Sequence, residues 1–159
     1  MVRRIRGAPD SLTVMASWRE IEADGPDFAA RARARFDAYK HKTMATLRKD
    51  GSPRISGIEV QFKDGQVELG MMPGSLKAKD LQRDPRVALH SGTEDPREEP
   101  NEVIDAKLSG LANEILGSDH HLFHVDVKEA VVISLGEPAD HLVIETWREG
   151  KGLTSTKRY

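Results

Sequence analysis

The sequence predicts a mainly β protein: a small antiparallel β-barrel with helices at its N-terminal end and one helix inserted between its third and fourth strands. Short runs of alternating apolar and polar residues fill most of the chain after residue 41. Asp-Gly pairs at Asp50-Gly51 and Asp64-Gly65 mark tight hairpins between such runs. Closing the strands into a barrel would pair their edges. An open α+β sandwich with the same strands is the alternative.

The first 40 residues have a helical pattern instead. Apolar residues from Trp18 to Tyr39 recur at intervals of three and four, and Gly25-Pro26 divides the stretch 11–40 into two helices. A chain of 159 residues has the usual size of one domain. We therefore expect a single structural domain, in which a helical extension over 1–40 packs on a barrel over 41–159.

Six or seven strands are expected. Three of them form an antiparallel meander over residues 42–72. A helix follows over Ser75–Arg83 and ends at Asp84-Pro85, because the residue before a proline avoids the helical region. The other strands are expected at residues 86–91, 106–115, 127–135 and 141–147, with a polar loop over 93–102.

Composition excludes several classes of function. The 24 basic and 26 acidic residues nearly balance, so the overall charge does not favour a nucleic acid or an anionic membrane as partner. The absence of cysteine excludes disulfides, thiolate metal sites and a cysteine nucleophile. No window approaches the roughly 18 apolar residues of a membrane span, and no apolar stretch follows the basic opening residues. We expect a cytoplasmic protein.

The segment "MMPGSLKAKDLQRDPR" contains a possible phosphate site. Ser75 stands where a helix N-cap is expected, so the amides of the first turn lack helical partners and can bind an anion. Lys77 can add a full charge there, whereas Lys79 lies about 200° further round the helix and should face solvent. From spacing alone, an ordinary surface helix with a solvated Lys77 is the favoured alternative.

Arg54 is a second candidate for binding a phosphate. It opens the strand after Asp50-Gly51, and alternation places it with Ser56 at the polar end of an otherwise apolar row. A guanidinium there can hold a phosphate through two hydrogen bonds. The alternative is an arginine solvated at a strand end.

The segment "HHLFH" and Trp147 suggest less specific roles. His120 and His124 have the spacing of two metal ligands on one helix, but the glutamate of a metalloprotease motif is absent, so no metal site is expected. A turn or short helix leading into a strand is the simpler interpretation of "HHLFH". Trp147 ends an apolar strand, where it would close a core or an interface, or flank a planar ligand.

Together these motifs resemble the pyridoxamine 5'-phosphate oxidase-like family, whose members bind FMN or a deazaflavin on a split β-barrel. The matching segments are "LRKDGSPRISGIEV", "DGQVELGMMPGSLKAKDLQRDPRVALHS", "AKLSGLA" and "IETWREG", from about Thr43 to the C-terminus. The serine-x-lysine helix followed by Asp-Pro-Arg is the most specific of them. The resemblance implies a split β-barrel of the FMN-binding type.

The resemblance also implies roles for individual residues. Lys77 and Arg54 would grip the phosphate of the cofactor, with Ser75 at the helix start. Ile55, Ser56, Gly57, Met71 and Met72 would line its ring and ribityl chain. Members of the family are homodimers with cofactor sites at the interface, so Trp147 would approach from the partner side, with Arg158 near the same region. These site residues are Arg54, Ile55, Ser56, Gly57, Met71, Met72, Ser75, Lys77, Trp147 and Arg158.

The function that follows is an oxidoreductase that uses FMN, or alternatively the deazaflavin coenzyme F-420, and transfers hydride to or from a small organic substrate. The cofactor performs this chemistry, so no side chain is assigned a catalytic role. A non-enzymatic carrier or sensor of a flavin or haem is the alternative, because no acid, base or nucleophile motif is present. A barrel used only for protein contacts is a third, weaker hypothesis.

Overall fold

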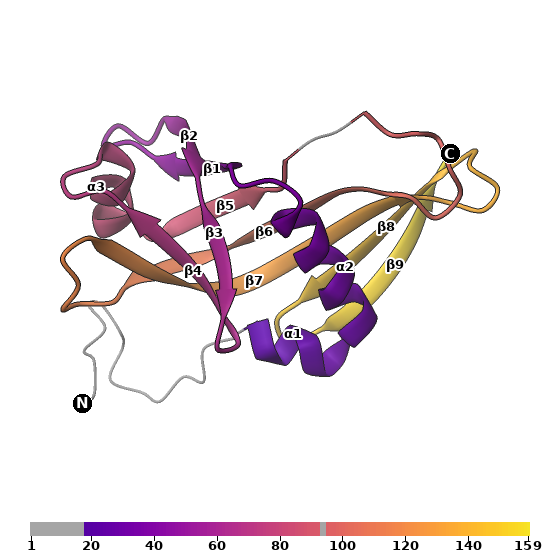
Figure 1. Ribbon diagram of the computed structural model, residues 1–159, viewed down its shortest axis with the longest axis horizontal. Coiled ribbons are helices and arrows are strands. Elements are labelled where there is room, and N and C mark those ends of the chain that lie inside the picture. The colour runs from indigo at the N-terminus through magenta and orange to yellow at the C-terminus, as the bar shows by residue number, and fades with distance from the viewer. Residues whose placement is uncertain (1–17, 93–94) are drawn as a thin grey trace.

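The computed structural model describes residues 18–92 and 95–159, which form a mainly antiparallel β structure with three helices (Figure 1). The helices are α1 (Trp18–Asp24), α2 (Pro26–Asp37) and α3 (Leu76–Arg83). The strands are β1 (Lys42–Leu47), β2 (Pro53–Ile58), β3 (Val60–Lys63), β4 (Gln66–Met71), β5 (Arg86–His90), β6 (Val103–Glu114), β7 (His121–Leu135), β8 (Leu142–Arg148) and β9 (Gly152–Arg158). No helix in these two ranges is long and apolar enough to cross a bilayer.

The expected three-stranded meander over residues 42–72 is wrong in its middle strand. That strand breaks at Glu59 into β2, which pairs with β1, and β3, which pairs with β4. The sheet then runs in the order β2-β1-β5-β6-β7-β4-β3, so the two halves of one predicted strand end on its opposite edges. Ile58 and Val60 are both buried beside the break, which shows that the chain turns while both sides of the turn keep core contacts.

The described residues contain nine strands, not six or seven. One extra strand comes from the break at Glu59. The other is β9, in a segment after Trp147 where no strand was expected; it pairs with β8 from Leu142↔Arg158 to Arg148↔Gly152. Gly150 and Gly152 have positive φ angles of 75° and 74° in the connecting turn, a conformation that glycine adopts without a steric penalty. The C-terminal segment therefore completes a hairpin.

The N-terminal helices α1 and α2 pack on the barrel; residues 11–17 of the predicted helical stretch lie outside the described ranges. Gly25 is the N-cap of α2 and Pro26 is its first residue. Trp18 and Phe36 both make edge-to-face contacts with Phe62 of β3, with ring centroids 4.7 and 5.8 Å apart. The helices thus cover the part of the core that lies beside β3.

The inserted helix matches the sequence prediction closely. Ser75 caps α3, and its hydroxyl accepts a hydrogen bond from the Ala78 amide at 3.3 Å. The helix ends at Asp84, which has extended dihedral angles and precedes Pro85. Ala78, Asp80 and Leu81 form its buried face against the barrel. Lys77 and Lys79 therefore leave the helix on different sides of that face.

Replacing Gly110 by alanine should destabilise the barrel. Gly110 lies at a β-bulge between β6 and β7, and an added Cβ would stand 2.0 Å from the carbonyl oxygen of Asp126, which is backbone and cannot move aside cheaply. Overpacking of this kind costs about 1–3 kcal/mol of unfolding free energy. Urea denaturation should show this loss for Gly110→Ala, while Gly57→Ala, whose added Cβ meets nothing within 4 Å, should unfold like the wild type. Equal stability of all three proteins would contradict the assignment of the bulge.

Candidate functional site

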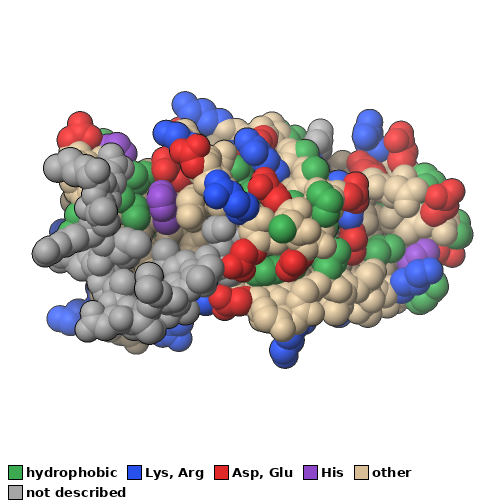
Figure 2. Space-filling model, turned by 90° about the horizontal axis from the view of Figure 1, so that it is seen from below, with side chains coloured by type: hydrophobic (Ala, Val, Ile, Leu, Met, Phe, Trp, Pro, Cys, Tyr) green, Lys and Arg blue, Asp and Glu red, His purple; other side chains and the backbone are tan. Residues whose placement is uncertain are grey.

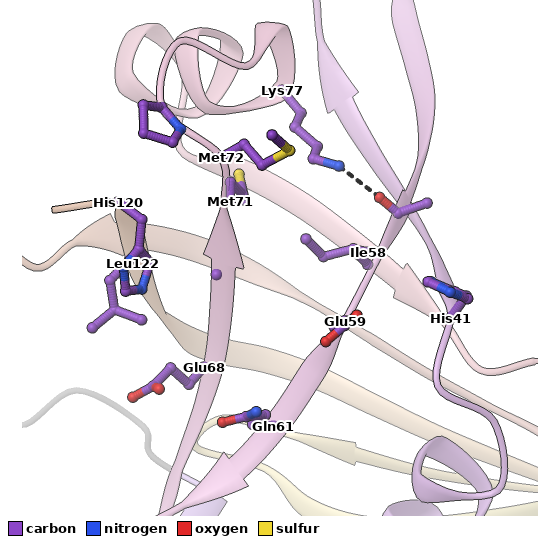
Figure 3. Close-up of a pocket in the computed structure, with 13 residues that line it drawn as sticks. His41, Ile58, Glu59, Gln61, Glu68, Met71, Met72, Lys77, His120 and Leu122 are labelled. Atoms are coloured by element: carbon purple, nitrogen blue, oxygen red, sulfur yellow. Dashed lines mark hydrogen bonds between the residues drawn. The ribbon is translucent and has the colours of Figure 1, made fainter. Parts of the chain in front are cut away.

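A cleft of about 630 Å³ lies between the β2–β3 segment, β4 and the start of α3 (Figure 3). This volume is in the range of small-molecule sites. Its apolar lining comes from Ile58, Met71, Met72, Pro73 and Leu122, its polar lining from His41, Glu59, Gln61, Glu68, Lys77 and His120, and the rest from Gly57 and Gly70. The cleft therefore brings together four of the predicted cofactor residues: Gly57, Met71, Met72 and Lys77.

The ammonium group of Lys77 lies at one end of this cleft. The side chain extends from α3 toward β2, and Nζ donates a hydrogen bond to the carbonyl oxygen of Gly57 at 2.7 Å (Figure 3). Within residues 18–92 and 95–159 no carboxylate pairs with it, although Glu59 and Glu68 line the same cleft. Its positive charge is thus available to an anionic group of a ligand.

A histidine fixes the turn that leads into α3. The Gly74 amide donates to Nε2 of His121 at 3.3 Å, so this nitrogen is an acceptor. The other ring nitrogen, Nδ1, lies 2.8 Å from Oε1 of Glu114 and donates to it. The imidazole of His121 therefore links the Pro73-Gly74 turn to β6 and β7, an interaction that no spacing in the sequence indicated.

Arg54 binds a buried carboxylate and does not line the cleft. Its Nε donates to Oδ2 of Asp80 at 2.7 Å, and the same oxygen accepts from the Thr46 hydroxyl at 2.7 Å. Arg83 donates to Oδ1 of Asp80 at 2.9 Å. Burial raises the pKa of Asp80, but the hydrogen bonds from Arg54, Thr46 and Arg83 outweigh burial and hold this pKa below its ordinary value. Sequence reasoning missed Asp80; its only local signal was an arginine three residues later on the same helix.

The free side of Arg54 faces a different hollow. This hollow, called the basic recess below, has a volume of about 640 Å³ and is lined by Arg48, Lys49, Asp50, Arg54, Leu76, Lys79, Asp80 and Arg83. Arg54 therefore shares a hollow with Lys79 and not with Lys77. Lys79, which was expected only to face solvent, lines this recess. Two side-chain contacts therefore join β2 and α3: Arg54 of β2 donates to Asp80 of the helix, and Lys77 of the helix donates to Gly57 of β2.

The other predicted residues of β2 divide between its two faces. Ser56 is half-buried on the face of Arg54, whereas Ile55 is 76% exposed on the opposite face. There Ile55 lines a further hollow of about 340 Å³ with Ala45, Ala88 and Val131. This face of the sheet, called the outer face below, is the one turned away from the core.

Trp147 and Arg158 lie apart from the cleft. The indole of Trp147 is 2% exposed, and its Nε1 donates to Oδ2 of Asp24 at 2.8 Å, so it closes the core against α1. Arg158 is exposed at the end of β9, opposite Leu142 of β8. Neither side chain contributes to the lining of the cleft formed by this chain.

Each histidine of the "HHLFH" segment has its own carboxylate. His120 pairs with Asp119, His121 with Glu114 and His124 with Glu68, at distances from 2.8 to 3.2 Å. Only His120 lies in the bend before β7, and the residues from His121 to His124 are already part of that strand, so the expectation of a turn or short helix holds for His120 alone. Among the described residues no group of three His, Cys, Asp or Glu side chains is placed to hold a metal ion.

Comparison with known proteins identifies the fold. No protein-family model matches the chain, and no curated protein matches it. A pyridoxamine 5'-phosphate oxidase-related, FMN-binding protein from Nostoc punctiforme is similar in structure, with a TM-score of 0.59, 14% identity and coverage of 89% of this chain and 97% of that one. PhzG from Burkholderia lata, solved with tetrahydrophenazine-1-carboxylic acid, has a TM-score of 0.59, 13% identity and coverage of 95% and 98%. A heme binding protein from Mycobacterium smegmatis has a TM-score of 0.52, 14% identity and coverage of 84% and 88%.

The resemblance proposed from the sequence motifs is thus confirmed at the level of the fold. The chain has the split β-barrel with added helices that these solved structures have, over most of its own length and of theirs. The named neighbours differ in what they bind, so the fold by itself does not choose a function.

Replacing Asp80 by asparagine should destabilise the protein in a pH-dependent way. The pKa of Asp80 is lowered in the folded state, so its stabilising effect is present above the unfolded value of about 4 and is lost as pH falls below it. At pH 7, Asp80→Asn should lower the unfolding free energy by about 1.5–3 kcal/mol, the range for hydrogen bonds to a charged group. Urea denaturation from pH 7 down to pH 3 measures the difference from wild type, which should shrink in acid.

The matched control is Glu22→Gln. Glu22 is exposed on α1 and has no partner among the described residues, so its replacement should change stability little at any pH. A constant difference between wild type and Asp80→Asn from pH 7 to pH 3 would show that ionisation of Asp80 does not stabilise the fold.

Proposed function

We propose that this protein is a flavin-dependent oxidoreductase that binds FMN, or alternatively the deazaflavin coenzyme F-420, in the cleft between β2, β4 and α3. The observation that carries the proposal is the Lys77 ammonium, which stands without a carboxylate partner among the described residues at one end of a cleft of small-molecule size. An FMN-binding protein and PhzG share the fold that builds this cleft. The substrate is a small organic molecule that exchanges hydride with the cofactor.

The residues of the cleft fit a phosphorylated planar cofactor. Lys77 would bind the phosphate, and Ser75 shapes the first turn of α3, where amides lack helical partners. Met71 and Met72 offer a polarisable apolar wall, and Gly57 lets a ligand approach the backbone of β2 closely. Arg54 acts as a positioning residue, because its contact with Asp80 holds α3 and therefore Lys77 in place.

The bound flavin supplies the hydride chemistry, and the chain's own residues bind, orient and shield it. The buried Met71 excludes water from the wall of the cleft, while Met72, which is 79% exposed, lies at its rim. The polar end with Glu59, Gln61 and Glu68 offers hydrogen-bond acceptors to a ring N–H group or to the substrate. We place this activity in the cytoplasm, in keeping with a chain that contains no cysteine.

We further propose that the protein is a homodimer joined through the outer face of the sheet. Two hollows adjoin there and share Ala45, Ala88 and Ser109, and apolar groups such as Ile55 and Val131 remain accessible around them. Small and apolar side chains on a sheet face allow close packing of a second sheet. A second copy would also bring its own residues toward Ile55 and the edge strand β2.

A ligand carrier is the second candidate function. One neighbour of the same fold is a heme binding protein, and the cleft contains two histidines, His41 and His120. The imidazole of His41 has no side-chain partner among the described residues and could ligate a haem iron. A carrier would bind its ligand without turnover, so a nicotinamide-linked or deazaflavin-linked assay separates it from an oxidoreductase.

Replacing Lys77 by alanine should weaken cofactor binding. Loss of a hydrogen bond to a charged group costs about 1.5–3 kcal/mol, which corresponds to roughly 10- to 100-fold in affinity. Fluorescence titration with FMN and with the deazaflavin measures this change, and the visible spectrum of protein purified from its native host identifies which of the two is bound. Lys151→Ala, a change in the exposed β8–β9 turn, is the control and should bind like the wild type. Unchanged affinity of Lys77→Ala would remove Lys77 from the site.

Replacing Ile55 by aspartate should produce a monomer. The side chain is 76% exposed on the outer face, so the substitution should leave the monomer folded while placing a charge in the interface. Light scattering coupled to size-exclusion chromatography reports the mass, and Leu116→Asp, on an exposed apolar residue outside both hollows, is the control. The dimer proposal fails if the wild type is itself monomeric or if Ile55→Asp remains dimeric.

A further inference from the structure

The basic recess between the β1–β2 hairpin and α3 is separate from the cofactor cleft. Its lining and that of the cleft have no residue in common, because Lys77 points to one side of α3 and Lys79 to the other. The recess is about as large as the cleft, at about 640 Å³. The recess is therefore large enough to bind a ligand other than the one in the cleft.

The charges around the recess are strongly unbalanced. Five cationic side chains, Arg48, Lys49, Arg54, Lys79 and Arg83, surround it with only two carboxylates, Asp50 and Asp80. By contrast, acidic and basic side chains are interspersed over the face shown in Figure 2, and the whole chain has a net charge of −2. Like charges gathered around a hollow repel one another unless an anion enters it.

The two carboxylates are already engaged. Asp50 accepts hydrogen bonds from the amide and the hydroxyl of Ser52, at 3.0 and 2.6 Å. Asp80 is 3% exposed and accepts from Thr46, Arg54 and Arg83, so its charge is shared between two guanidinium groups. An excess of three positive charges therefore faces the recess.

The buried carboxylate also orients the arginines. Arg54 uses only Nε in its contact with Asp80, and Arg83 uses only one terminal nitrogen, for Asp80 and the carbonyl of Leu47. The remaining N–H groups of both forks have no acceptor among the described residues. Lys49 and Lys79 likewise have no partner in the described part of the chain. Donors held in place in this way bind an anion with little further loss of conformational freedom.

We propose that the basic recess is a second anion site, which binds a ligand with a diphosphate group. A single phosphate monoester carries about two negative charges near neutral pH, so an excess of three cations suits the larger charge of a diphosphate. Leu76, which is 59% exposed at the edge of the recess, offers an apolar contact to an organic part of such a ligand. Both free pyrophosphate and a nucleoside diphosphate present this chemistry.

The test is isothermal titration of the full chain with sodium pyrophosphate at low ionic strength. Saturable binding of one pyrophosphate per chain is expected, with inorganic phosphate about tenfold weaker or more. The double variant Lys49→Gln/Lys79→Gln should weaken pyrophosphate binding at least about tenfold, because two cations are lost from the recess. Both side chains are exposed and unpartnered among the described residues, so the variant should unfold in urea like the wild type.

Two controls locate the bound anion. Lys77→Gln, in the cofactor cleft, and Lys151→Gln, in the β8–β9 turn, should keep wild-type affinity for pyrophosphate. Absence of saturable binding, unchanged affinity of the double variant, or loss of binding in Lys77→Gln alone would each overturn the proposal. Titration with ADP and AMP then identifies the source of the diphosphate: tighter binding of ADP than of pyrophosphate indicates a nucleotide, and binding of pyrophosphate alone indicates the free anion.

Discussion

The contact between the buried carboxylate of Asp80 and Arg54 determines the arrangement of both candidate sites. A buried charge is tolerated only when it is fully paired, and Asp80 finds its partners on β1, β2 and its own helix. The helix α3 can therefore neither slide along β2 nor rotate on it. Because successive residues turn by about 100° round a helix, this one fixed orientation sends Lys77 into the cleft and Lys79 into the basic recess.

Much of the local structure could be predicted from the sequence, because it depends on neighbouring residues. The cap at Ser75, the end of α3 at Asp84 and the division of the N-terminal helices at Gly25-Pro26 follow from backbone chemistry within a few positions. The break at Glu59 could not be predicted, because neither glycine nor proline occupies that position. Which strand β2 and β3 each pair with is decided by contacts far away in the chain. The strand β9 was not predicted because it is almost entirely exposed, so its sequence is mostly polar and shows no apolar alternation.

The candidate site was predicted in part. Gly57, Met71, Met72 and Lys77 do line one cleft, since the alternation of strands and the spacing in α3 already place them near one another. The partners of charged groups were not predictable: Arg54 binds Asp80, 26 positions away, and not a residue beside Lys77. Trp147 was open to either a structural or a ligand-binding role from its position at a strand end, and its hydrogen bond to Asp24 accounts for it structurally. Side-chain pairing depends on tertiary distances that no local pattern contains.

The hydrogen bond between Trp147 and Asp24 also gives the protein a built-in optical reporter. The chain has two tryptophans, and both are almost completely buried where α1 meets the barrel: Trp18 in the helix itself and Trp147 in β8. The wavelength of their intrinsic fluorescence therefore depends on whether the N-terminal helices are packed against the sheet. A red shift of that emission would signal that the helices have lifted away, even while the far-ultraviolet signal of the strands is unchanged.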